Sequence, residues 1–427
     1  MERIKRLLAE AGIAEYIAVQ TEERTAELFF VRQQLDTRRI KDVSRVSVSV
    51  YRESGEGEER QKGQSDAMLL PAMSDEACVK ALRDAYYAAQ FAMNPWYAAP
   101  DPIRAPQVKK TGEIMERSCE ELAGLTAKAL FDADDAEGAF VNSAEVFVSQ
   151  RTVRVISSEG ADVSWTEGKA EGEYVVQALE PEDVEMHRQF AFDELDCETL
   201  SDDVREALRF VRDRARAQSV LKSGVYDLIL TRENAATVLR YYCQRSSARM
   251  CYPGYSTWKP GDDVQGESSG ERLELTLRAN TPYSWEGIPM TDKKLLTDGK
   301  LQIIHGENRL CRYLGIPATG DYRRFSCENE GSLSFAEMKA RPCLWAVTFS
   351  DFQMDSFSGH FGGEIRLAYL IEDGVLTPVT GGSVNGSLME AQSGFAFSKE
   401  RFTGMDYRGP YALMLKNVKV AGTQEAE

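Results

Sequence analysis

Apolar and polar positions alternate with two different periods at the start of the chain. Residues 1–12 carry isoleucine and leucine at helical spacing and end at Gly12, which predicts a short amphipathic helix. The run VSVSVYR has a period of two, which indicates a strand at residues 45–52 with one buried face. Shorter strands are expected between these two segments, at residues 16–22, 27–34 and 35–42.

Helix and strand patterns follow the same theme in the next stretch of the chain. Pro100, Pro102 and Pro106 mark a connector after a helix expected at residues 75–93. Beyond the connector the pattern predicts helices at residues 112–131 and 201–219, with strands between them at 140–150, 152–158, 162–168 and 174–179. We therefore interpret the two segments as related α+β subdomains, residues 1–106 and residues 107–220.

Strand patterns dominate the remaining half of the chain. The apolar run in KSGVYDLILT leads into a helix expected at residues 233–246, with Thr231 as its cap. Asp373-Gly374 is a strong hairpin signal between strands expected at 366–372 and 375–379, and further strands are expected at 344–352 and 411–420. The expected fold class is α+β: two related N-terminal α+β subdomains followed by a β-rich C-terminal domain, residues 221–427.

Composition narrows the classes of partner. The 427 residues carry 51 lysines and arginines against 68 aspartates and glutamates, a net charge of -17, which argues against a nucleic-acid partner. No apolar run approaches the roughly 18 residues of a membrane helix, and the first residues lack an apolar signal core. Eight cysteines without a CxxC pair are expected to be reduced thiols. These features predict a cytoplasmic protein that binds no membrane.

Histidine is scarce, which limits metal and acid–base chemistry. Only His187, His305 and His360 occur, each more than fifty residues from the next. A zinc hydrolase usually presents two histidines on one helix face, and the sequence has no such pair. His305 precedes Glu307 in IIHGEN, but a turn after an apolar segment explains this run more simply than a catalytic pair does.

A family resemblance emerges from the C-terminal hairpin. The segment SGHFGGEIRLAYLIEDGVLTPVTGGSVNGSLME, residues 358–390, resembles the TldD/PmbA family of peptide-maturation proteases, in which a glycine-bearing strand leads into a hairpin and a further glycine-rich strand. LKNVKVAG, residues 415–422, is similar to the family's terminal strand. Earlier segments agree in order and spacing, namely Ala92–Tyr97 of the first subdomain, residues 157–176 of the second, and SGVYDLILTRENAATVL at the start of the C-terminal domain.

The resemblance implies one of two kinds of subunit. TldD-type chains carry HExxxH on the helix after that opening strand, and a zinc-binding cysteine near the C-terminus. PmbA-type chains, also called TldE, lack this set and pair with a TldD-type partner. Here the corresponding helix reads VLRYYCQRSS, residues 238–247, without histidine or glutamate, and residues 392–427 contain no cysteine. The chain therefore resembles a PmbA/TldE-like member without zinc of its own, and zinc is expected only in a TldD-type partner.

These implications define the candidate site and function. No catalytic residue and no metal ligand is expected in this chain. The degenerate motif helix is expected to line a cavity with Arg240, Tyr241, Tyr242, Cys243, Gln244 and Arg245. The resemblance implies a catalytically silent subunit of a TldD/PmbA-type metalloprotease assembly that acts on unfolded peptides, which it would accept as added β-strands.

Two alternatives remain open at this point. The chain could be a homodimeric peptide-binding protein without a protease partner. It could also be a hydrolase that uses Cys243, which would need a base such as His187 or His305, or a metal held by His305 and distant acids. A buried cysteine that packs beside Leu239 is the simpler explanation for Cys243.

Overall fold

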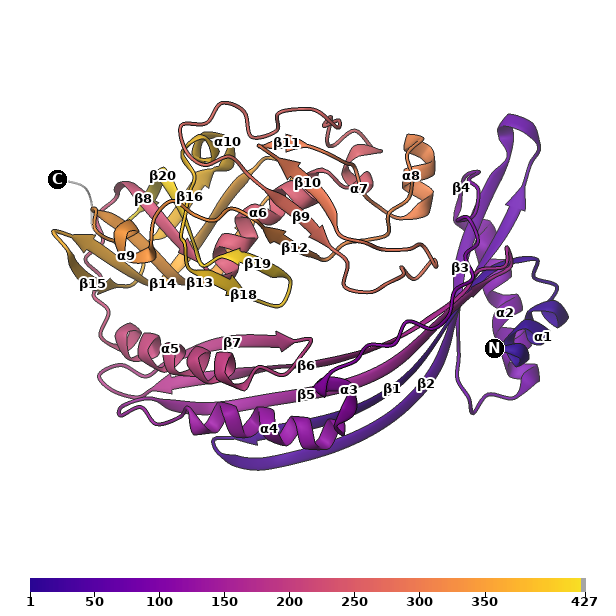
Figure 1. Ribbon diagram of the computed structural model, residues 1–427, viewed down its shortest axis with the longest axis horizontal. Helices are drawn as coiled ribbons and strands as arrows, with labels where there is room; N and C mark the ends of the chain where they lie inside the picture. The colour runs from indigo at the N-terminus through magenta and orange to yellow at the C-terminus, as the bar shows by residue number, and fades with distance from the viewer. Residues whose placement is uncertain (424–427) are drawn as a thin grey trace.

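The computed structural model describes residues 1–423, and its mixed α+β architecture places the three sheets of these residues in distinct regions. A long, curved N-terminal sheet carries helices α1 and α2 at one end and α4 and α5 towards the other (Figure 1). The C-terminal half forms a second body beside it, built from two further sheets. The fold class expected from the sequence is confirmed.

The N-terminal sheet has seven strands in the order β4-β3-β2-β1-β5-β6-β7, and all neighbouring strands are antiparallel. Its strands are β1 Glu15–Val31, β2 Gln34–Ser54, β3 Gln61–Leu69, β4 Met93–Pro95, β5 Phe140–Ser157, β6 Asp162–Ala178 and β7 Val184–Phe192. Its helices are α1 Glu2–Ala11, α2 Asp75–Ala88, α3 Glu113–Glu116, α4 Cys119–Asp132 and α5 Cys197–Ala215.

One order of elements occurs twice around the middle of this sheet. Helix α1, strands β1 to β3 and helix α2 form the first copy, and helix α4, strands β5 to β7 and helix α5 form the second. The first strands of the two copies, β1 and β5, pair antiparallel from Ile17 with Ser157 to Val31 with Ser143. The two segments thus share one sheet, and the boundaries at residues 106 and 220 stay predictions.

Several strand predictions were wrong in length. The four strands expected before residue 53 are two long ones, β1 and β2, which turn at Arg32 with a φ of 53°. Polar residues such as Glu23 interrupt the apolar pattern, but the backbone pairing does not stop there. Glu23 pairs with Val43 of β2 on one side and with Arg151 of β5 on the other. β5 and β6 likewise run unbroken where two shorter strands each were expected. β7 was missed because it lies in an acid-rich stretch.

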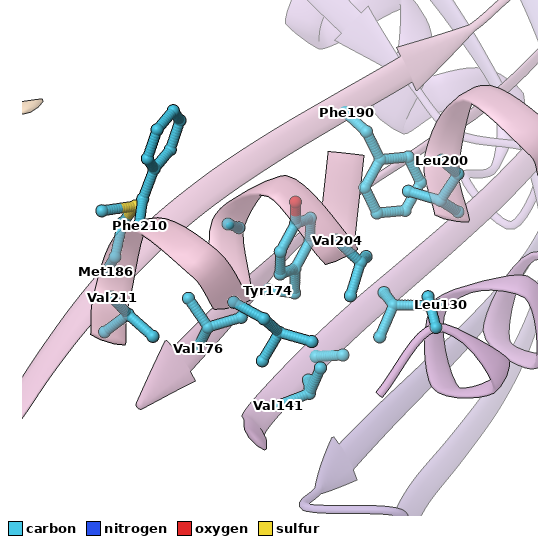
Figure 2. Close-up of a cluster of buried hydrophobic side chains, with 14 of the residues drawn as sticks. Leu130, Val141, Tyr174, Val176, Met186, Phe190, Leu200, Val204, Phe210 and Val211 are labelled. Atoms are coloured by element: carbon cyan, nitrogen blue, oxygen red, sulfur yellow. The ribbon is translucent and has the colours of Figure 1, made fainter. Parts of the chain in front are cut away.

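The main core lies where α4 and α5 cover strands β5 to β7. Figure 2 shows its side chains, which include Leu130 of α4, Val204 of α5 and Tyr174 of β6. The same core continues into the C-terminal half, because the ring of Phe210 on α5 lies 5.7 Å from that of Trp345. Helix α5 therefore joins the N-terminal sheet to the C-terminal body.

The C-terminal half contains a closed ring of strand pairings. Strands β13, β8, β20, β16 and β14 pair in this order, and β14 pairs back with β13. These strands are β8 Gly224–Thr231, β13 Cys343–Met354, β14 His360–Glu372, β16 Ser383–Ser387 and β20 Ala412–Ala421, with β15 Val375–Val379 and β17 Ala396–Phe397 attached at their edges. Asp373 and Gly374 both have positive φ, 49° and 78°, which confirms the tight hairpin between β14 and β15.

A smaller sheet and short helices complete this half. The sheet has the order β11-β10-β9-β12-β19-β18, with β9 Leu275–Arg278, β10 Lys293–Thr297, β11 Lys300–Leu301, β12 Arg324–Cys327, β18 Arg401–Thr403 and β19 Tyr407–Pro410. The helices are α6 Glu233–Arg245, α7 Ala248–Cys251, α8 Asn308–Leu314, α9 Phe335–Met338 and α10 Leu388–Ala391. None of the helices in residues 1–423 is long and apolar enough to cross a membrane.

Candidate functional site

Helix α6, which carries the degenerate motif, begins at a strained residue. The cap is not Thr231, as expected, but Arg232, whose φ of 57° and ψ of -126° lie in a region that side chains rarely adopt. Thr231 instead accepts a hydrogen bond from the indole of Trp345. The Arg232 guanidinium pairs with Asp203 at 2.5 Å and Glu206 at 2.8 Å, both on α5. These ion pairs tie the start of α6 to the N-terminal half.

The two arginines of the motif window point to different parts of the molecule. Arg240 donates to the carbonyl oxygen of Arg323 at 3.0 Å and lies over the ring of Phe325. Arg245, by contrast, donates to the carbonyl oxygen of Tyr255 at 2.6 Å and lies over the ring of Trp258. The two guanidinium groups thus contact separate elements rather than one shared ligand position.

The tyrosines between them belong to the core. Tyr242 is fully buried, and its hydroxyl donates to Gln392 Oε1 at 2.7 Å. Tyr241 is 3% exposed and packs edge-on against Trp258. Gln244 is the exposed member of the window. That these six side chains line a cavity stays a prediction.

Cys243 and His305 lie close together, but not as a nucleophile and its base. His305 Nε2 is 2.9 Å from the carbonyl oxygen of Cys243, so this nitrogen donates to the backbone rather than facing the thiol. Nδ1 of His305 is buried without a hydrogen-bond partner in residues 1–423. Burial raises the pKa of the Cys243 thiol to about 12 and lowers the pKa of His305. A thiolate nucleophile is therefore disfavoured at neutral pH.

The other two histidines are exposed and lie on separate sheets. His187 on β7 contacts Glu173, with Nε2 3.2 Å from Oε2, and His360 at the start of β14 contacts the hydroxyl of Ser358. The structure thus brings none of the three histidines together.

Zinc does not fit the residues of the degenerate motif. The window offers two arginines, which stay protonated, a buried thiol of raised pKa, two buried tyrosines and a glutamine. Zinc requires deprotonated thiolates, neutral imidazoles or carboxylates held in one shell. Within residues 1–423 no three histidine, cysteine, aspartate or glutamate side chains are placed to hold a metal ion.

A second candidate site lies where the N-terminal sheet meets the C-terminal half. One face of strands β1, β2 and β3 and the residues around Trp285 and α8 enclose a cavity of about 550 Å³, which we call the junction cavity. Its lining side chains are Ile17, Val19, Thr21, Arg45, Ser47, Ser49, Tyr51, Gln64, Asp66, Tyr97, Trp285, Glu286, Glu307 and Arg309. The strand residues share one face because successive side chains alternate across a sheet.

Glu286 is the acidic side chain of the junction cavity whose pKa is shifted furthest from its ordinary value. Its Oε2 accepts a hydrogen bond from the backbone N–H of Asn308 at 3.0 Å, which fixes the carboxyl group beside the start of α8. Burial raises the pKa of Glu286 to about 7, and the neighbouring carboxylates of Glu307 and Asp321 act in the same direction. Arg309 lies nearby and pairs with Glu307 at 3.7 Å.

The sequence indicates this cavity only in part. Its motifs include Tyr97, within Ala92–Tyr97, and Glu307, beside His305, but no pattern marks Glu286 or the cavity position of Tyr51. The alternation in VSVSVYR does place Ser47, Ser49 and Tyr51 on one face. What no local pattern indicates is that a loop more than 230 residues later closes over that face.

Comparison with known proteins identifies the family of the C-terminal half of the chain. Residues 223–422 match the PmbA/TldA metallopeptidase C-terminal domain. This half carries a domain of the TldD/PmbA family. No curated protein matches the sequence. The family resemblance read from the hairpin and the opening strand is thus confirmed.

Solved structures show that the fold extends over the whole chain. TldE from Thermococcus kodakarensis superposes with a TM-score of 0.78 at 17% identity, covering 98% of this chain and 100% of that one. A candidate modulator of a DNA gyrase from Thermotoga maritima gives 0.77 at 16% identity, covering 98% and 99%. Another, from Bacteroides thetaiotaomicron, gives 0.80 at 14% identity, covering 99% and 98%. At these identities the likeness establishes the fold.

Proposed function

We propose that the chain is a catalytically silent subunit of a TldD/PmbA-type metalloprotease assembly that acts on unfolded peptides. One observation carries the proposal. The helix that bears HExxxH in TldD-type chains here holds side chains that are buried, protonated or already hydrogen-bonded, as Arg240, Tyr242 and Cys243 show. A TldD-type partner would supply zinc and the activated water.

The cysteines support a reducing compartment for the assembly. All eight are free thiols. Free thiols are the rule in the reducing cytoplasm, so we place the assembly there.

The test mixes the purified chain with a cognate TldD-type subunit and follows hydrolysis of denatured casein. The mixture should cleave, a chelator should abolish cleavage, and this chain alone should be inactive. Alone, it should also retain far below one equivalent of zinc after dialysis against a weak chelator. A full equivalent that is lost in His305→Gln or His360→Gln would overturn the proposal.

Cys243→Ser separates the thiol-hydrolase alternative from the silent-subunit role. If the isolated wild type cleaves casein and Cys243→Ser does not, a thiol mechanism is at work. Gln244→Ala is the matched control, because Gln244 lies next to Cys243 on α6 but is exposed. It should behave like wild type in every assay.

A homodimeric peptide binder without a protease partner is the second candidate. The junction cavity favours it, because its polar side chains and the exposed ring of Trp285 offer a peptide a place to bind. Co-purification decides between the two: a TldD-type subunit that is retained with this chain supports the first, and a stable homodimer that retains none supports the second.

A further inference from the structure

We infer that the junction cavity binds a primary ammonium group carried by a peptide, with Glu286 as its counter-charge and the hydroxyls of Tyr51 and Tyr97 as further hydrogen-bond partners. The inference takes the peptide substrate class from the proposed function, but it requires neither a protease partner nor catalytic silence. Three independent features of the cavity support it.

Two tyrosine hydroxyls of the junction cavity have no partner in the protein. Tyr51 is 9% exposed and Tyr97 is 7% exposed, yet neither hydroxyl makes a hydrogen bond within residues 1–423. Several other tyrosine hydroxyls donate to protein acceptors, namely Tyr174 to Asp203, Tyr242 to Gln392, Tyr369 to Asp213, Tyr407 to Pro410 and Tyr411 to Glu206. The hydroxyl of Tyr241, which is 3% exposed, also lacks such a bond within residues 1–423. The hydroxyls of Tyr51 and Tyr97 differ from it because these two side chains line the junction cavity, where a ligand or solvent can complete them.

Negative charge exceeds positive charge around Glu286. The cavity wall carries Asp66, Glu286 and Glu307 against Arg45 and Arg309, and Arg309 is already paired with Glu307. Only Oε2 of Glu286 is engaged, by the backbone of Asn308. A cation bound at this carboxyl group would relieve the repulsion from its acidic neighbours, whereas an anion would add to it.

The same tyrosine rings already lie beside one ammonium group. Lys62 is 2% exposed, and its Nζ lies 5.8 Å from the ring centre of Tyr51 and 5.1 Å from that of Tyr97. Its charge is balanced by Glu15 at 2.5 Å. An ammonium group paired with a carboxylate against aromatic faces is thus an arrangement that this part of the fold already stabilises. In the cavity, Glu286 and the exposed ring of Trp285 offer equivalent groups to a ligand.

A binding assay on the full chain alone tests the inference. The probe is a lysine-free pentapeptide with a free amino terminus and a fluorophore at its carboxyl end. Its binding is measured by fluorescence anisotropy. One comparison peptide is N-acetylated, and another is N-acetylated but carries a single lysine. We expect the free amino terminus or the lysine to improve affinity at least about tenfold over the acetylated, lysine-free peptide, as one charge-assisted hydrogen bond supplies. Equal affinity for all three peptides, or no binding at millimolar probe, overturns the inference.

The pH profile distinguishes the two sources of the ammonium group. Binding should strengthen from pH 6 to 8 as Glu286 ionises. Above pH 8 it should weaken for an α-amino group and persist to about pH 10 for a lysine, since their ordinary pKa values differ. The titratable and charged groups that face Glu286 are Glu307, Asp321, Arg309, Tyr51, Tyr97 and Cys311.

Two variants and one control complete the design. Glu286→Gln keeps an acceptor for the Asn308 N–H but removes the charge, and should lose about tenfold in affinity for the amine-bearing peptide. Tyr97→Phe should lower the affinity for the same peptide. It should leave the fold intact, because the Tyr97 hydroxyl has no protein partner. Glu372→Gln, in the exposed hairpin end of β14, removes an equal charge far from the cavity and should change nothing. Unchanged affinity in both cavity variants overturns the inference, and failure of the cleavage assay with a TldD-type subunit would instead count against the proposed function.

Discussion

Helix α6 and the junction cavity both hold tyrosines and titratable side chains, but the two regions differ in whether these polar groups are engaged within the protein. On α6 the hydroxyl of Tyr242 is buried with Gln392 as its partner, and the thiol of Cys243 lies in the core. In the junction cavity the hydroxyls of Tyr51 and Tyr97 lack partners within residues 1–423, and Glu286 faces open space. The hydroxyl of Tyr242 and the thiol of Cys243 are therefore engaged within the protein, whereas we propose that the binding capacity of this chain lies at the junction of its two halves.

The largest effect that we expect is on the alkylation rate of Cys243, which tests whether this part of α6 is buried in the core. If the thiol belongs to the core, a neutral alkylating reagent should modify it only after unfolding, on the order of 10³-fold more slowly than in denaturant. The pKa of about 12 adds to this protection because little thiolate exists near pH 8. Peptide mass spectrometry after timed alkylation measures it. Partly exposed Cys251, on α7, serves as the internal control and should react earlier. Rapid alkylation of Cys243 in the native protein would show that α6 borders an accessible site.

Replacement of Glu286 by glutamine should stabilise the protein at alkaline pH. The folded pKa of about 7 lies above the ordinary value near 4.5, so the folded state binds the proton more tightly than the unfolded state. Its contribution to stability is therefore full below about pH 4.5 and is lost as the pH rises towards 7. Glu286→Gln should be more stable than wild type by about 2 kcal/mol at pH 8, and the difference should shrink towards pH 5.

Urea unfolding at pH 5, 7 and 8 measures this difference. Glu372→Gln is the matched control, because its carboxylate is exposed and lies outside the cavity. A Glu286→Gln variant that is less stable than wild type at pH 8 would mean that the ionised carboxylate is already well compensated in the cavity.

The contrast between the two regions also explains what the sequence could and could not reveal. Local signals were sufficient for α1 with its Gly12 stop, for the Asp373-Gly374 turn and for the strand that leads into α6. They failed where tertiary pairing overrides local polarity: β1 continues through Glu23 because strands on both sides supply hydrogen bonds. The start of α6 at Arg232 was missed for a related reason, since ion pairs to α5 hold a backbone conformation that no local pattern favours.

The candidate site divides in the same way. The absence of histidine and glutamate from residues 240–245 is a property of the sequence and could be read directly. The packing of β12 and of the segment around Tyr255 decides which of these side chains are buried. It also decides that Arg240 and Arg245 point apart. The junction cavity joins β2 to Glu286, residues that only the folded chain brings together.

A matched pair of tyrosine substitutions gives the smallest but most direct test of the comparison. Tyr242→Phe removes the hydrogen bond to Gln392 and leaves a buried amide oxygen unsatisfied, so it should lower the free energy of unfolding by about 1–2 kcal/mol. Tyr97→Phe removes a hydroxyl with no protein partner, so its effect should stay within about 0.5 kcal/mol. Both changes delete the same atom from a tyrosine that is more than nine-tenths buried, so the difference between them reports hydrogen bonding rather than lost packing. Urea unfolding of the two variants beside wild type, at pH 7 and without peptide, measures it. Equal losses would mean that the Tyr97 hydroxyl is already satisfied in the free protein, and the junction cavity would then offer a ligand one partner fewer than we propose.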